Sequence, residues 1–522
     1  MSKQYSESLL RYGLAEFKPE WASIQRGIEK ESLRVTRSGE ISLQPHPKAL
    51  GSALTNPYIT TDFSEALLEF ITPVYESVDD CLNVLEQIHR FTLQHLDAEQ
   101  LLWVASMPCP LGREEDIPIA QYGDSNIGRM KTLYRHGLHH RYGSLMQVIS
   151  GIHYNFSMPD VFWPEFQRQL GHGGSLQDFK TDRYLHLIRN FHRYSWLLIY
   201  LFGASPAACK CFAQGREHGL EELDKKTLYL PYATCLRMGN LGYKSEAQKS
   251  LFVCYNELET YVKCLHDGIH TPFPPYEKIG QGSNGEYRQI NTNLLQLENE
   301  FYSTIRPKPK LNKGDRPLAA LARSGIEYIE VRALDLNPYL PLGIDAEQIR
   351  FLDSFLLHCL LAESPACDKR EFFEVGDNIA RVVESGRDPE LELKEVDSPR
   401  KMRDWASSLL ADIEHSAGLL DHLHACNAYG SSLEKQKQKL ANPDLTPSGR
   451  MLTDMKSGQL SFFDFAMTQS GTLSDSLRQN KLDAATLKQL QLASQKSLAQ
   501  LREVEAGDGQ TFEEYLRDWN KH

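Results

Sequence analysis

The 522-residue chain lacks any apolar run long enough to cross a membrane. Its most apolar stretch, Trp196–Phe202, ends at a glycine, whereas a spanning helix needs about 20 such residues. The first 18 residues mix basic and acidic side chains and contain no continuous apolar segment, so they do not predict a secretory leader. We therefore expect a cytoplasmic protein without a membrane anchor.

Paired-cysteine motifs and a basic surplus are also missing. The ten cysteines are scattered, and the closest pair, Cys209 and Cys211, lacks the two-residue spacer of a zinc or redox motif. Mostly free thiols are expected, as is usual in the cytosol. With 57 Lys+Arg against 69 Asp+Glu, the formal net charge is −12, which disfavours nucleic acid and anionic membrane as partners.

Several nucleotide-binding and hydrolase motifs are absent. The chain has no Walker loop, no G-x-S-x-G elbow and no kinase signature. Gly280–Gly285 does match G-x-G-x-x-G, but the residues that follow are strand-like, so Asn284 and Gly285 are predicted to form a hairpin turn. The histidine-rich segments His136–His140 and His422–Cys426 lack a zinc ligand set and are interpreted as solvent-facing.

What is present is ordinary globular composition, 41% hydrophobic and 24% charged. Helical spacing predicts helices within residues 1–20, from Ser77 to Phe91, over Asp182–Phe202, over Asp345–Ala362 and in the last ninety residues. Strands are expected between these helices. We predict a catalytic domain over residues 1–370 and a mainly helical region over residues 371–522, packed on that domain.

Three predicted strands carry polar side chains on one face. Glu29 and Glu31 alternate along the first strand and therefore project from the same side. His153, Asn155 and Ser157 share a face of the second strand, and Tyr328, Glu330 and Arg332 share a face of the third. Together they favour a sheet whose polar face forms an open cup. Solvated outer faces and a structural His153 remain alternatives, because sequence does not show that the strands are neighbours.

The acidic residues of these segments predict a divalent metal site. Two carboxylates that share a pocket repel each other and need a counter-charge. Glu69 lies between Leu68 and Phe70 in a run expected to be buried, so it needs a cation or hydrogen-bond donors. Oxygen ligands with one imidazole suit Mg²⁺ or Mn²⁺ better than zinc.

Basic residues accompany these acids and favour chemistry on phosphoryl groups, because arginine and metal ions spread the charge of a transferring phosphoryl. Arg135 and Arg237 lie near small residues. Arg129 and Lys308, taken singly, are interpreted as surface charge.

Several stretches resemble glutamate–cysteine ligase of the gammaproteobacterial type. The resemblance runs from about residue 20 to residue 360 and fades over the last 150 residues. It rests on Gly27–Val35, Thr60–Pro73, Gln121–Gly123, Thr132–Arg135, Arg141–Ser157, Leu201–Pro206, Leu230–Thr234, Ile305–Lys308 and Gly325–Pro338.

The resemblance implies an α+β fold of the glutamine synthetase-like kind, in which a curved, mainly antiparallel sheet forms a funnel surrounded by helices. It implies ligation of the γ-carboxylate of L-glutamate to the amino group of L-cysteine, with ATP as co-substrate and Mg²⁺ (or Mn²⁺) as cofactor. This reaction is the first step of glutathione biosynthesis. A monomer and feedback inhibition by glutathione are also expected.

Site residues follow from matching motifs. The resemblance assigns Glu29, His153 and Glu330 to a metal on the nucleotide phosphates, and Glu31, Asp62 and Glu69 to a second metal; Glu29 and Glu330 also lie close to a third. Arg332 and Arg135 resemble the phosphate and transition-state arginines. Arg237 would bind a substrate α-carboxylate, and Tyr134 and Tyr243 would border the cysteine pocket.

Other functions are weighed against this one. A related carboxylate–amine ligase could use another amine acceptor, and a two-metal hydrolase would release phosphate from ATP without glutamate. A catalytically dead binding protein is disfavoured because all six metal ligands are retained. A bifunctional enzyme that also adds glycine is disfavoured because the residues after 370 leave no room for a second ATP-using domain. The Tyr243 segment, beside Gly239 and Gly242, is expected to close over the site as a loop.

Overall fold

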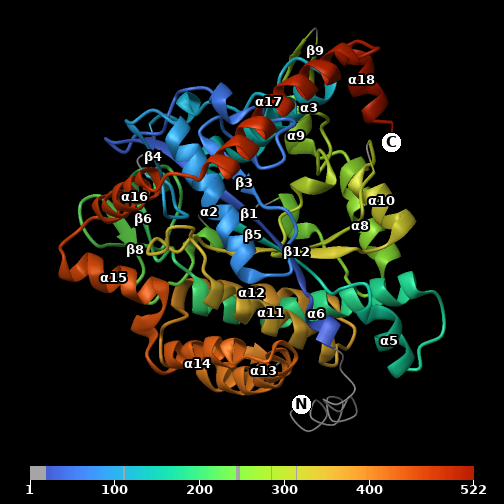
Figure 1. Ribbon diagram of the computed structural model, residues 1–522, viewed down its shortest axis with the longest axis vertical. Coiled ribbons are helices and arrows are strands. Elements are labelled where there is room, and N and C mark those ends of the chain that lie inside the picture. Colours follow the sequence, from blue (N-terminus) through green and yellow to red (C-terminus); the bar gives the residue numbers. More distant parts are fainter. Residues whose placement is uncertain are drawn as a thin grey trace.

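The structure is a computed structural model that describes residues 19–109, 112–240, 242, 247–283, 285–312, 314–396 and 398–521. Helices surround a central sheet in it (Figure 1). The helix predicted within residues 1–20 falls almost entirely outside the described residues, as does Tyr243. Among the described residues, none of the helices has the length and apolar character needed to cross a bilayer.

The central sheet has seven strands, and every pairing in it is antiparallel. Six strands follow one another across the sheet, and β4 pairs with part of β1. In spatial order they are β11 (Ile305–Lys308), β12 (Tyr328–Leu334), β5 (Ile152–Ser157), β1 (Gln25–Thr36), β3 (Leu67–Ile71) and β2 (Ile59–Thr61), with β4 (Gln100–Leu102). The strands predicted from alternation are therefore neighbours.

One face of this sheet is apolar. Tyr154 of β5 lies opposite Ile28 of β1 and Val331 of β12, and all three side chains are fully buried. Helices α6 (Leu176–Phe202) and α11 (Ala346–Leu361) lie beside each other and contribute to the same hydrophobic core. Because successive side chains point to opposite faces, burial of this row directs the intervening polar residues to the other side.

The three long helices predicted within the first 370 residues are confirmed, with one early start. Helix α2 (Val78–His95) begins at Ser77, whose hydroxyl accepts from the amide of Asp80. Asp345 caps α11 by accepting from Gln348. Helix α6 begins before the predicted Asp182, because Ser175 provides an N-cap about two turns earlier.

The C-terminal helices pack back on the sheet domain. Helices α13 and α14 contact α11, α16 and α17 contact α2, and α18 contacts α3. Their bounds, with that of α3, are α3 (Asn126–Tyr142), α13 (Met402–His424), α14 (Ala428–Ala441), α15 (Pro447–Ser457), α16 (Phe462–Gln479), α17 (Ala484–Ala506) and α18 (Phe512–Trp519). Figure 1 shows helices α13 to α18 in orange and red around the sheet.

The remaining elements complete the fold, and the predicted hairpin is among them: β9 pairs antiparallel with β10, and Gly285 has a left-handed φ of 86°. Asn284 is outside the described residues. The remaining bounds are α4 (Ser144–Gln147), α5 (Phe162–Gln169), α7 (Lys210–Ala213), α8 (Leu258–His270), α9 (Pro274–Ile279), α10 (Pro317–Ser324), α12 (Lys369–Ser385), β6 (Ala207–Cys209), β7 (Glu221–Glu222), β8 (Thr227–Tyr229), β9 (Gly282–Ser283), β10 (Glu286–Tyr287), β13 (Glu392–Glu395) and β14 (Ser398–Lys401).

Candidate active site

The strand register brings acidic and imidazole side chains together on the polar face of the sheet. Glu29 of β1 lies directly opposite His153 of β5, and Glu31 lies opposite Glu69 of β3. Glu330 of β12 lies opposite Asn155 of β5. Directly paired residues point to the same face, so four strands contribute to one polar surface.

His153 is the centre of this cluster. Its Nδ1 lies 3.2 Å from Glu29 Oε2 and 3.8 Å from Glu330 Oε1, and its Nε2 lies 3.9 Å from Glu31 Oε1. One ligand atom from each of Glu29, Glu69 and His153 also falls within 4.8 Å of the others. Five of the six residues assigned to metals from sequence therefore converge.

Asp62, the sixth of the residues assigned to metals, affects the cluster through the negative charge of its carboxylate. It follows β2, and its backbone is held by Leu67 on one side and by the Tyr122 hydroxyl and Arg135 guanidinium on the other. Burial first, and then the Asp62 carboxylate, raises the pKa of Glu31 to about 8. Burial and the carboxylates of Glu29, Asp62 and Glu31 hold the pKa of Glu69 well above its ordinary value.

Two cations compensate the other end of the cluster. Lys308 Nζ lies 3.0 Å from Glu330 Oε1, and Arg332 Nη1 lies 3.2 Å from Glu330 Oε2 and 3.4 Å from His153 Nδ1. Burial raises the pKa of Glu330, but Lys308 and Arg332 outweigh it and bring that pKa well below normal. The interpretation of Lys308 as surface charge was therefore wrong: its strand places it against a buried carboxylate.

The donor set fits a hard divalent cation. The acids at the Glu31–Glu69 end have raised pKa values because burial and mutual repulsion disfavour their charges. Asn155 Oδ1 is buried and has no hydrogen-bond partner within the described part of the chain, while its amide donates to Glu29 at 2.9 Å. Carboxylate and amide oxygens with one imidazole are ligands that suit Mg²⁺ or Mn²⁺.

A cavity of about 510 Å³ opens beside the cluster, a volume typical of small-molecule sites. The residues that line it include His153, Arg237 and Arg332 as well as the aromatic side chains of Phe252 and Phe372. A lining with both charged and aromatic side chains suits a substrate that has polar and apolar surface.

Arg237 reaches the cavity from a fixed position. Its Nε donates to Asp335 at 2.8 Å, and its Nη2 donates to the carbonyls of Arg332 and Leu334 at 3.0 and 2.8 Å. At Gly242, an added Cβ would overlap the Arg237 carbonyl at 1.6 Å, so the chain passes close to Arg237 just before Tyr243. Binding of a substrate carboxylate by Arg237 stays a prediction, as does the role of Tyr243.

Helix α3 positions Tyr134 and Arg135 at the edge of the site. The Arg135 guanidinium stacks on the Tyr122 ring at 4.5 Å and donates to the carbonyl of Asp62 and, at 2.9 Å, of Lys131. Burial and the nearby Glu300 charge hold the pKa of Tyr134 well above normal, so its phenol stays protonated. The substrate roles of both residues stay predictions.

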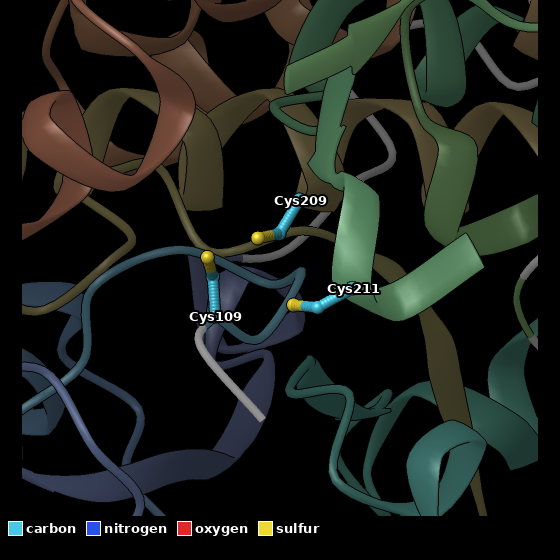
Figure 2. A group of neighbouring side chains, drawn as sticks. All are labelled: Cys109, Cys209 and Cys211. Carbon is cyan, nitrogen blue, oxygen red and sulfur yellow. The ribbon is translucent and has the colours of Figure 1, made fainter. Parts of the chain in front are cut away.

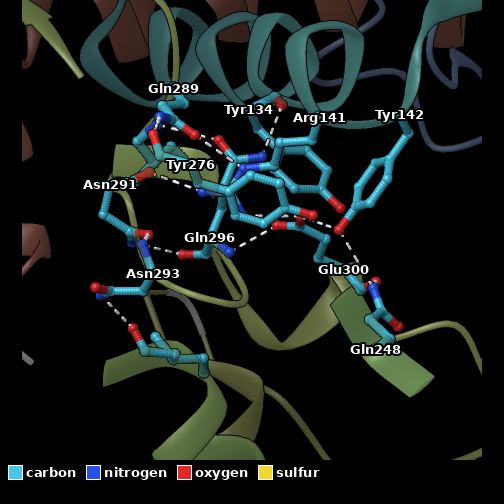
Figure 3. Close-up of polar contacts among 12 residues, drawn as sticks. Tyr134, Arg141, Tyr142, Gln248, Tyr276, Gln289, Asn291, Asn293, Gln296 and Glu300 are labelled. Atoms are coloured by element: carbon cyan, nitrogen blue, oxygen red, sulfur yellow. Dashed lines mark hydrogen bonds and ion pairs between the residues drawn. The ribbon is translucent and has the colours of Figure 1, made fainter. Parts of the chain in front are cut away.

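A buried ion pair behind Tyr134 was not predicted from sequence. Arg141 of α3 lies 3.0 Å from Glu300, and both side chains are fully buried. Figure 3 shows the surrounding contacts: Tyr142 also donates to Glu300, and Gln296 donates to the Tyr134 carbonyl. Arg141 begins one of the stretches with a family resemblance, but no local pattern identified Glu300 as its partner.

Comparison with known proteins gives consistent matches. A family profile described as glutamate–cysteine ligase matches residues 14–382. The chain is 50% identical over 503 residues to a glutamate–cysteine ligase of Alcanivorax borkumensis, covering 95% of this chain and 96% of that one. It is 48% identical over 515 residues to one from Pseudomonas aeruginosa strain PAO1, covering 98% of this chain and 97% of that one.

Solved structures match as well. A glutamate–cysteine ligase from Francisella tularensis, crystallised in complex with AMP, superposes with a TM-score of 0.90 at 37% identity, covering 95% of this chain and 97% of that chain. A bifunctional glutathione synthetase from Pasteurella multocida has a TM-score of 0.67 at 24% identity, covering 90% of this chain and 53% of that one. The second likeness concerns the fold alone.

Proposed function

The chain belongs to the glutamate–cysteine ligase family, and we propose that its polar sheet face carries out an ATP- and Mg²⁺-dependent ligation. The reaction is the joining of L-glutamate to L-cysteine, the first step of glutathione biosynthesis. The observation that carries the proposed site is the convergence of Glu29, Glu31, Glu69, Glu330 and His153 on one sheet face beside a cavity.

Magnesium would be held by the six residues assigned from sequence. Glu29, His153 and Glu330 would form one ligand group, and Glu31, Asp62 and Glu69 another, with Glu29 and Glu330 close to a third ion. When bound, the metal neutralises phosphate charge and polarises phosphoryl oxygens. Its charge would also lower the pKa values of Glu31 and Glu69, which the metal-free site leaves raised.

In the first step, the glutamate γ-carboxylate would attack the ATP γ-phosphate and give γ-glutamyl phosphate and ADP. Two anions must approach each other, so permanent positive charge at the site is required. Arg332 meets this need, because Glu330, Glu31 and Glu29 more than compensate its burial and raise the pKa of its guanidinium. We propose that Arg332 and Arg135 contact the transferring phosphoryl.

In the second step, the cysteine amine would attack the acyl phosphate and release inorganic phosphate. The amine must lose a proton, which we assign to a pocket carboxylate. Water must be excluded in the meantime, because acyl phosphates hydrolyse. We propose that the Tyr243 segment closes over the cavity, that Arg237 binds a substrate α-carboxylate, and that Tyr134 and Tyr243 border the cysteine side chain.

Broader features of the family belong to the same proposal. The sheet would form a glutamine synthetase-like funnel, with a catalytic domain over residues 1–370 and a helical region over residues 371–522. We propose a cytoplasmic monomer that glutathione inhibits. An acceptor other than cysteine is the second candidate function, because the aromatic residues that line the cavity do not by themselves select a thiol.

Phosphate release tests the reaction. ATP and Mg²⁺ with glutamate and cysteine should give rapid release, whereas glutamate alone should give little and ATP alone none. Serine, 2-aminobutyrate and polyamines replace cysteine in parallel reactions. Faster turnover with any of them would favour the alternative acceptor, and release without glutamate would indicate a hydrolase.

The Glu330→Gln variant tests the site. Loss of the charge should lower kcat by about a hundredfold or more with an unchanged circular dichroism spectrum. Excess chelator should abolish the wild-type activity, and added Mg²⁺ should restore it. A fully active Glu330→Gln enzyme would contradict the proposed ligand set.

A further inference from the structure

A cluster of three cysteine side chains lies away from the carboxylate site. Cys109 follows β4 along the chain, Cys209 ends β6, and Cys211 is in α7. Figure 2 shows their sulfur atoms pointing toward one another from these separate segments. All three Sγ atoms lie within 4.8 Å of one another, and none is in a disulfide.

We propose that Cys109, Cys209 and Cys211 bind one zinc ion through three thiolates, at a site independent of the proposed catalytic metals. Zinc with Zn–S bonds of about 2.3 Å places tetrahedral thiolates roughly 3.8 Å apart, so the observed sulfurs need to approach by no more than roughly 1 Å. The inference goes beyond the proposed ligase function and does not depend on it.

The chemistry of its ligands distinguishes the cysteine site from the carboxylate site on the sheet. Among the described residues, no carboxylate or imidazole joins the three sulfurs. Thiolates are soft ligands that prefer zinc or monovalent copper to Mg²⁺. Three thiolates leave a net charge of −1 with Zn²⁺ and −2 with Cu⁺, and a buried site disfavours the larger charge. Zinc is therefore the ion we expect.

The cysteine cluster is buried on the side of Cys109 and Cys209 and partly exposed at Cys211. Cys109 is 1% exposed and packs in a hydrophobic cluster with Phe212 and Leu228. Cys209 is 9% exposed, and Cys211 is only partly buried. An ion can therefore enter beside Cys211, where water can supply a fourth ligand.

Thiol groups are weak hydrogen-bond donors and acceptors, so the three cysteines interact only weakly with one another. The sulfurs of Cys209 and Cys211, together with burial, raise the pKa of Cys109 far above normal. Cys109 lowers the pKa of Cys209, but Cys211 and burial raise it, and it lies at about 11. Zinc binding must displace the thiol protons, because the ligands of zinc are thiolates.

The segments that carry Cys109 and Cys209 also bond to neighbouring residues of the chain that follows β12. Ser106, three residues before Cys109, accepts from the Leu336 amide through its hydroxyl. Ser205, four residues before Cys209, donates to Asp335, the residue that holds Arg237. An ion that joins the segments would therefore stabilise the chain that follows β12.

Cobalt substitution tests the proposal on the full chain. The protein is stripped of metal, kept reduced under argon and saturated with Mg²⁺, so that the carboxylate site is occupied. Added Co²⁺ should give thiolate-to-cobalt charge-transfer absorption that saturates at one ion per chain, and Zn²⁺ should abolish it. Zn²⁺ should also raise the thermal midpoint further than Mg²⁺ does alone.

The Cys211→Ser variant is decisive because Cys211 is partly exposed and its substitution leaves the core intact. It should lose the charge-transfer band and weaken zinc binding by about a hundredfold. Cys209→Ser should behave likewise, whereas Cys426→Ser, at an exposed cysteine, should match the wild type. A reduced wild type without the band, an unchanged Cys211→Ser, or loss of two thiols as a disulfide without zinc uptake would overturn the proposal.

Discussion

Lys308 fixes the charge of the Glu330 carboxylate. Its ammonium lies 3.0 Å from Glu330 Oε1, and Glu330 is almost completely buried. Without a cation, a buried carboxylate at this position would favour its protonated form. A lysine at the end of a short edge strand thus influences one of the carboxylates of the proposed metal site.

We predict that Lys308→Met lowers kcat/KM by about tenfold to a hundredfold, because Glu330 loses its closest counter-charge. Lys308→Arg, which keeps the charge, should retain most of the activity. Steady-state kinetics measure both.

Lys310→Met is the matched control, since Lys310 is exposed two residues further along the chain. It should leave kcat/KM unchanged. Equal activity of Lys308→Met and Lys310→Met would show that Lys308 has no role in the site.

Helix α3 is held in place by a charge pair inside the protein. Arg141 near its end is bound by Glu300, Gln289 and the Asn291 carbonyl, and its guanidinium stacks on Tyr276 at 4.2 Å. The same helix carries Tyr134 and Arg135 one to two turns earlier. The position of these two residues therefore depends on contacts among residues that do not line the cavity.

We predict that Glu300→Gln destabilises the protein by about 3 kcal/mol or more, because it leaves the Arg141 charge buried without a partner. Denaturant unfolding at constant m-value measures the change. Asp267→Asn, which breaks an exposed pair with Lys263, should have no measurable effect. A Glu300→Gln midpoint equal to that of Asp267→Asn would contradict the prediction.

Buried histidines affect the stability of the entire molecule. Burial lowers the pKa of His186 to about 4 and, together with the His415 charge, that of His358 to about 3. Both pKa values lie below the unfolded value of about 6.5. As the pH falls below 6.5, the unfolded chain therefore binds protons before the folded one, and stability is lost down to about pH 4 for His186 and about pH 3 for His358.

His358→Gln should make the loss of stability between pH 7 and pH 4 shallower by on the order of 3 kcal/mol. Denaturant midpoints at several pH values in this window measure the slope. His218→Gln, at an exposed histidine, is the control and should keep the wild-type slope. An unchanged slope in His358→Gln would show that the pKa of this histidine is the same in the folded and the unfolded protein.

Sequence alternation predicted the strands and the shared faces of Glu29 with Glu31 and of Glu330 with Arg332, because a period of two is a local property. It did not predict which strands are neighbours, since β12 and β5 pair across more than 170 residues. Lys308 and the Cys109 contact with Cys209 and Cys211 were missed for the same reason.

The order of the strands along the chain also decides when each charged residue is synthesised. The acids of β1 and β3 leave the ribosome first, and the counter-charges on β11 and β12 follow only after some 240–260 further residues. At about 5–20 residues per second, this interval lasts roughly 12–50 s. For that time the nascent chain carries the acidic residues of β1 and β3 without the counter-charges of β11 and β12, so that magnesium can bind the acids before these cations are made.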